Sequence, residues 1–129
     1  RDSVASRGLG DVYKRQDDVA EQYRQFIKNF GPLEKLLEDA PAPAEAFIAR
    51  VLLLHSWRRI VLHDPQLPTP MLPDNWPGHA ARELCGRIYW RVFDASEAHL
   101  DALAGKDNDR YTPLTAEGES RFGGRPPAA

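Results

Sequence analysis

Five prolines fall between Asp64 and Gly78, and this segment restricts the fold more than any other feature of the sequence. Proline has no backbone N–H and clashes with the preceding helical turn, so the segment cannot form a regular helix or a central strand. We predict an ordered proline-rich connector (residues 64–78) between helices, with a docking surface for aromatic recognition as the alternative. The side chains expected to pack down onto the helices are Leu67, Met71, Leu72 and Trp76.

The first helix is predicted over residues 17–37, because apolar side chains recur there at three- and four-residue steps. Asp17 and Asp18 suit its start, since acidic side chains are stabilised near the unpaired N–H groups of a helix N-terminus. Gly31-Pro32 interrupts the pattern, and the helix is predicted to kink or break there because proline disfavours helix at the preceding residue. The apolar positions are Val19, Tyr23, Phe26, Ile27, Phe30, Leu33 and Leu37.

Two further helices are predicted, over residues 44–63 and 79–103. The earlier of the two is apolar over most of its circumference, a pattern typical of a central helix. The later one has a single apolar side, and Gly105 follows it as a stop signal. The sequence therefore predicts an all-α fold of three main amphipathic helices, with the first helix kinked or broken at Gly31-Pro32.

The two ends of the chain differ in composition from this helical region. Residues 1–16 show neither a helical nor a strand period, and we expect them to be a non-native leader of vector or adaptor origin. Residues 17–105 are expected to form one helical domain, which fits a chain of 129 residues. Residues 106–129 are polar and rich in Gly and Pro, so a disordered tail is expected, from which Tyr111 or Phe122 could dock.

The charge balance and the apolar runs exclude several classes of function. A net charge of -2 and a pI near 6.1 do not provide the basic face that binding to nucleic acid phosphates requires. The longest apolar run, Val51 to Leu54, is far shorter than the roughly 20 residues that span a bilayer. A single cysteine, Cys85, excludes an intramolecular disulfide. We expect a cytoplasmic protein without a membrane partner.

No arrangement of residues predicts catalysis or metal binding. The sequence has no Gly-rich phosphate loop, no HExxH and no Gly-x-Ser-x-Gly motif. His55 and His63 are eight residues apart, or about 12 Å along a helix, which is too far for one metal ion. Cys85 lies on the apolar side of the third helix, where cysteine behaves as a small hydrophobic residue. We expect no catalytic residue, no metal and no cofactor, and therefore no enzyme.

The end of the second helix carries the candidate ligand-binding residues, His55, Trp57, Arg58 and Arg59. Guanidinium groups bind phosphate oxygens bidentately, and an indole offers a stacking face, so this group could bind a phosphate-bearing ligand. In the alternative, Arg58 and Arg59 pair with acidic residues of a neighbouring helix or interact with the last helical carbonyls, which favour basic residues. The spacing alone leaves both alternatives open.

One specific pattern extends from the second helix through the connector into the third helix. It consists of the run Phe47 to Arg59, Asp64-Pro65-x-Leu67-Pro68, Leu72-Pro73, Trp76-Pro77-Gly78, Ala80-Ala81 and Leu84. With this pattern, residues 19–103 resemble the C-terminal domain of the phenylacetic acid degradation repressors, the PaaX family. The resemblance implies a bacterial transcriptional repressor in which a winged-helix DNA-binding domain and a ferredoxin-like domain precede this helical domain, and in which phenylacetyl-CoA relieves repression. DNA contact would then depend on a missing N-terminal domain.

The resemblance supports two hypotheses for this module. In the first, it contributes dimer or interdomain contacts and senses phenylacetyl-CoA, with Arg58 and Arg59 at the CoA phosphates and Trp57 in the acyl pocket. In the second, it is a purely structural helical oligomerisation module without a ligand. Ser56-Trp57 stands where the family often has Glu-Tyr. The aromatic face is kept, but a carboxylate beside the arginines is lost, which alters the expected ligand preference.

Overall fold

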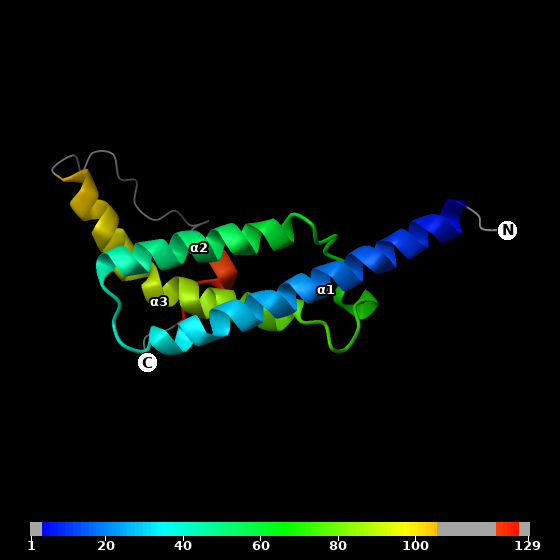
Figure 1. The fold of residues 1–129 in the computed structure, drawn as a ribbon, viewed down its shortest axis with the longest axis horizontal. Helices are drawn as coiled ribbons and strands as arrows, with labels where there is room; N and C mark the ends of the chain where they lie inside the picture. Colours follow the sequence, from blue (N-terminus) through cyan, green and yellow to red (C-terminus); the bar gives the residue numbers. More distant parts are fainter. Residues whose placement is uncertain (1–3, 106–120, 127–129) are drawn as a thin grey trace.

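Three long helices make up most of the computed structural model, which describes residues 4–105 and 121–126 (Figure 1). They are α1 (Val4–Leu36), α2 (Pro43–Val61) and α3 (Gly78–Ala104), and consecutive helices run in opposite directions. Two short 3-10 helices complete the fold: η1 (Thr69–Met71) in the connector and η3 (Arg121–Gly123) near the C-terminus. No strand occurs within these ranges, and the predicted all-α fold is confirmed.

Helix α1 begins well before Asp17, contrary to the predicted start. Its first turns project beyond the other two helices (Figure 1), and Val12 and Tyr13 are exposed there. A helical segment without a buried face needs no apolar period, and an existing helix extends more easily than a new one forms. Periodicity therefore could not reveal this part of α1. The expectation that residues 1–16 are a non-native leader stays a prediction.

Helix α1 also does not break at Gly31-Pro32, because it continues through Pro32 to Leu36. Proline inside a helix costs about 3 kcal/mol, mainly through a lost hydrogen bond and a clash with the preceding turn. Here the proline lies close to the end of the helix. Phe30 and Leu33 pack against the core on either side of it, and Leu37 is buried, so packing holds this last turn in place.

The central helix is α3, not α2. Helix α3 packs against both other helices, whereas α1 and α2 contact each other much less. On the outer face of α2, Ile48, Val51 and Leu52 are 57%, 49% and 55% exposed. The prediction that the second helix is central is therefore wrong: its apolar circumference includes a solvent-facing side. The largest fully buried hydrophobic side chains are Tyr89, Leu53, Ile88, Val19, Val92 and Cys85.

Arginines of α3 attach the end of α1 to the bundle. The Arg87 Nε lies 2.6 Å from a carboxylate oxygen of Glu34. One turn later, Arg91 donates hydrogen bonds to the carbonyl oxygens of Leu37, at 2.7 Å, and Glu38. Carbonyl groups at the end of a helix have no partner within the helix, so Arg91 satisfies two groups that would otherwise need water.

The proline-rich connector packs on the helices, and the prediction that it is ordered is confirmed. Trp76 is half-buried against the core, and its ring lies 5.9 Å from that of Tyr23 in an edge-on arrangement. Asp64 accepts a hydrogen bond from the Gln66 backbone N–H at 2.8 Å. Met71 is 63% exposed, so it does not pack as predicted. Leu67 and Leu72 are half-buried.

The remaining boundaries agree with the pattern to within two residues. Gly105 ends α3 with a φ of 61°, a conformation that glycine adopts without the penalty of a side chain. Beyond it, residues 121–126 lie against α3, and Phe122 packs on the core. The expectation that residues 106–129 are mostly a disordered tail stays a prediction. Residues 106–120 and 127–129, with Tyr111, lie outside the described residues. None of the described helices is long and apolar enough to cross a membrane.

Candidate functional site

An apolar cavity of about 470 Å³ opens between the second half of α2, the beginning of α3 and η3. Its floor is aliphatic and aromatic, three arginines stand around it, and none of the described residues that line it is acidic. Concave sites with an apolar lining and a few charged groups are typical of small-molecule sites. The lining residues are Leu54, Trp57, Arg58, Val61, Leu62, Arg82, Arg121 and Phe122.

Trp57 is held in this cavity by a group of aromatic rings. Its ring centroid lies 5.4 Å from that of Phe26 and 5.7 Å from that of Tyr23, both on α1. On the opposite side, the ring of Phe122 lies 6.2 Å away at a steep angle. Edge-on and tilted contacts at these separations are favourable for aromatic pairs. Trp57 therefore has a fixed orientation, with Leu54 and Val61 one turn away on the same helix face.

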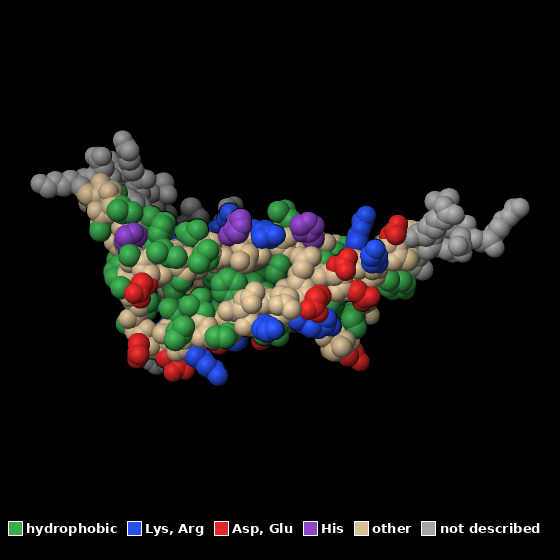
Figure 2. Space-filling model, viewed as in Figure 1, with side chains coloured by type: hydrophobic (Ala, Val, Ile, Leu, Met, Phe, Trp, Pro, Cys, Tyr) green, Lys and Arg blue, Asp and Glu red, His purple; other side chains and the backbone are tan. Residues whose placement is uncertain are grey.

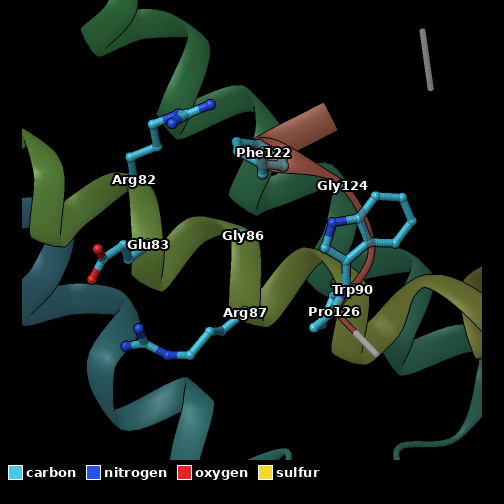
Figure 3. A pocket seen from close by; sticks show the side chains of 8 residues that line it. All are labelled: Arg82, Glu83, Gly86, Arg87, Trp90, Phe122, Gly124 and Pro126. Atoms are coloured by element: carbon cyan, nitrogen blue, oxygen red, sulfur yellow. The ribbon is translucent and has the colours of Figure 1, made fainter. Parts of the chain in front are cut away.

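The C-terminal strap (residues 121–125) forms the other wall of the cavity. The Trp90 indole donates a hydrogen bond to the Arg121 carbonyl at 3.2 Å, and the Arg125 guanidinium lies 2.7 Å from the Asp94 carboxylate. A smaller cavity of about 260 Å³ lies on the other side of Phe122. Figure 3 shows the side chains that line it, with Trp90 beside the strap. Phe122 thus separates two cavities.

The structure does not bring the four predicted ligand-binding residues together. Trp57 and Arg58 line the apolar cavity, whereas Arg59 lines a separate cavity of about 340 Å³ between α1 and α2, beside His63. His55 is exposed on the outer face of α2 and lines neither cavity. Successive residues of an α-helix are rotated by about 100°, so adjacent arginines necessarily point to different sides.

The alternative of internal ion pairs is not observed for the paired arginines. Neither Arg58 nor Arg59 has a salt bridge to an acidic residue within residues 4–105 and 121–126. His63, which follows on the same helix end, contacts the Arg59 carbonyl oxygen through its Nδ1 at 2.7 Å. Both guanidinium groups are exposed and available to a ligand or a partner.

Sequence reasoning missed Arg82 and Arg121 as site residues. Arg82 begins the second turn of α3, and Arg121 precedes the strap phenylalanine, so each is far from Arg58 along the chain. No local pattern marks either arginine, because only the packing of three separate segments brings them to one cavity. The apolar character of Phe122 was the single signal that this region would dock.

Two buried groups have perturbed pKa values, and neither forms a reactive site. Burial raises the pKa of the Tyr23 hydroxyl, and its hydrogen bond to Asp64 adds to this shift. Burial also raises the pKa of the Cys85 thiol, so the thiol is protonated at neutral pH and is a poor nucleophile. No group of three or more potential metal ligands occurs in the described part of the chain.

Comparison with known proteins identifies relatives of the helical domain. The family described as "PaaX-like protein C-terminal domain" matches residues 15–102. The transcriptional repressor PaaX of Escherichia coli (strain K12) is 43% identical over 108 residues, which cover 79% of this chain and 33% of that protein. The chain therefore spans about a third of the length of this curated relative.

Proposed function

The chain belongs to the PaaX-like C-terminal domain family, and on that basis we propose that it is the signal-receiving C-terminal module of a bacterial transcriptional repressor. Its net charge of -2 gives the chain no overall attraction for the phosphates of DNA. In this proposal, DNA contact is made by a domain N-terminal to the module. The module itself works in the cytoplasm without a cofactor or a catalytic role.

The apolar cavity with its arginine rim is the observation that carries a sensing role. A phenylacetyl group is flat and apolar, and it matches a floor formed by Leu54, Trp57 and Phe122. The CoA portion carries several phosphates, for which the Arg58 guanidinium offers bidentate hydrogen bonds. Phenylacetyl-CoA is therefore the proposed effector, and its acyl end occupies the cavity.

The outer face of α2 supports a second role in subunit or interdomain contact. Ile48, Val51 and Leu52 form an exposed apolar stripe on one side of this helix. Figure 2 shows hydrophobic side chains gathered over this part of the molecule, followed by basic and histidine side chains along the same edge. Soluble proteins rarely leave such a patch uncovered, so we propose that a second copy or an upstream domain covers it.

Isothermal titration of the full chain with phenylacetyl-CoA tests the sensing role, with free CoA and phenylacetate as controls. The expected result is saturable binding that neither control reproduces, because each control retains only one of the two chemical features. Absence of binding by a sample with an intact helical spectrum would contradict sensing. The exposed α2 face would then favour the second candidate, a purely structural oligomerisation module.

A further inference from the structure

We propose that Arg82 and Arg121 bind the phosphate-bearing end of the effector, and that the C-terminal strap is a structural wall of the binding site. This inference rests on the proposed sensing role and deepens it. It assigns two binding residues that lie outside the basic pair of α2, and it makes residues 121–125 part of the sensor. The ligand class is an apolar acyl group joined to a carrier with several negative charges.

No acidic side chain of the described residues neutralises the positive charge around the cavity. Neither Arg58 nor Arg82 has an acidic partner in the part of the chain that the structure describes. Arg121 lies with its guanidinium carbon 5.6 Å from the centre of the Tyr89 ring and donates to the Tyr89 hydroxyl at 3.3 Å. That partner is neutral. Three guanidinium groups around one cavity therefore favour a polyanion over a lone carboxylate.

The direction of the Arg82 side chain places its charge at the apolar cavity. Figure 3 shows its guanidinium turned toward the side on which Phe122 lies and away from the Glu83 carboxylate. Arg87, five residues further along α3, borders the smaller cavity but is paired with Glu34. Arg82 has no acidic partner among the described residues and remains available to an anion.

A further cavity, of about 360 Å³, adjoins the apolar cavity and gives an extended ligand room to lie. It lies beneath the proline-rich connector and shares Trp57, Val61 and Arg82 with the apolar cavity. Asp64 also lines this connector cavity, which makes it the less favourable place for phosphate. The anionic end of the ligand is therefore assigned to the arginine rim of the apolar cavity, outside the floor that holds the acyl end.

The position of Arg121 depends on close packing of the strap. A Cβ atom at Gly86 would lie 3.1 Å from the Cβ of Phe122, so any other residue there would require the strap to move by a few tenths of an ångström. Phe122 itself has a φ of 56°, a left-handed conformation that a bulky residue rarely adopts. Its ring contacts with Trp57 and Tyr89 hold it there. The strap is therefore a preformed wall that carries Arg121 to the cavity.

Titration of full-chain variants with phenylacetyl-CoA tests this assignment. Arg82→Ala and Arg121→Ala are each expected to weaken binding by about tenfold or more, because each removes charged hydrogen bonds to phosphate. The dependence of affinity on salt is expected to become shallower as well. Arg59→Ala is the matched control, since Arg59 lines the separate cavity, and its affinity is expected to stay within about twofold of the wild type.

Gly86→Ala tests the strap without removing a charge. Alanine favours helix more than glycine does, so α3 is expected to stay folded while the new methyl group displaces Phe122 and weakens binding. Gly31→Ala is the control, because nothing lies within 4 Å of a Cβ at that helical position. If the wild type binds phenylacetyl-CoA and Arg82→Ala, Arg121→Ala and Gly86→Ala bind it equally well, this inference is overturned while the sensing role stands. Wild-type protein that does not bind would overturn the sensing role itself.

Discussion

The Tyr23 hydroxyl lies 2.5 Å from the Asp64 carboxylate, and this hydrogen bond joins α1 to the first residue of the proline-rich connector. The other carboxylate oxygen of Asp64 accepts the backbone N–H of Gln66, whose φ is 55°. One carboxylate therefore fixes both the turn at the end of α2 and its attachment to α1. The same Tyr23 ring contacts Trp57 and Trp76, so the turn is coupled to the floor of the candidate site.

Replacing Tyr23 by phenylalanine is expected to lower the free energy of unfolding by about 1–3 kcal/mol, because a half-buried carboxylate loses a charged hydrogen bond. Urea denaturation followed by circular dichroism measures this change. Tyr13→Phe is the matched control, since Tyr13 is 59% exposed, and its unfolding is expected to be unchanged. Equal stability of Tyr23→Phe and the wild type would show that the turn does not depend on this bond.

The raised pKa of Tyr23 predicts a loss of stability at alkaline pH. In the unfolded chain the hydroxyl ionises near its ordinary pKa of about 10, whereas in the folded protein it keeps its proton to higher pH. The stabilisation from Tyr23 is therefore fully present below about pH 10 and decreases as pH rises above that value. Unfolding of the wild type and Tyr23→Phe, compared at pH 8 and at about pH 11, is expected to show a smaller difference at the higher pH. A difference that stays constant would contradict this linkage.

Arg50 is expected to be a major link between α2 and α3. Its guanidinium lies 2.7 Å from the Glu97 carboxylate and within 5.5 Å of the centres of the Tyr89 and Phe93 rings. Arg50→Ala is expected to destabilise the fold by about 1–2 kcal/mol, since the pair is only partly exposed and the ring contacts are lost too. Arg50→Lys should recover only part of this, because lysine lacks the planar group. If Arg50→Lys recovered the full stability of the wild type, only the charge of Arg50 would matter and the ring contacts would not.

The outer face of α2 gives a prediction about association. Val51→Glu combined with Leu52→Glu is expected to leave the unfolding transition nearly unchanged, because both side chains are about half exposed. Self-association measured by sedimentation velocity is expected to weaken. Leu36→Glu, at an exposed position near the end of α1, is the control and should associate like the wild type. A monomeric wild type at every concentration would exclude a dimer contact on this face in the isolated chain.

The Cys85 thiol is expected to resist labelling in the folded protein. It is completely buried, and burial raises its pKa, so little thiolate forms at pH 8 and little reagent reaches it. Reaction with a chromogenic disulfide reagent should be slow in buffer and fast in about 6 M urea, where denaturant unfolds a small domain. Fast reaction under native conditions would show that the core around α3 opens readily.

Local patterns in the sequence determined most of the helices. The boundaries of α2 and α3 agree with prediction to within two residues, because apolar periodicity, proline and glycine act over only a few residues. The packed connector also followed from its prolines and its aromatic residue, Trp76. At the projecting start of α1 no side of the helix is buried, so the sequence has no apolar period there. The same reasoning therefore did not predict this part of the helix.

Tertiary packing alone decided the layout of the candidate site. Consecutive arginines on a helix point about 100° apart, so Arg59 was separated from Arg58 and joined a different cavity. Arg82 and Arg121 reached the site because α3 packs in the centre and Gly86 admits the strap. The sequence makes α2 apolar over most of its circumference and α3 apolar on one side, yet α3 is central, because long-range contacts decide which helix the others pack against. Local periodicity measures how apolar a face is, whereas the fold determines what covers it.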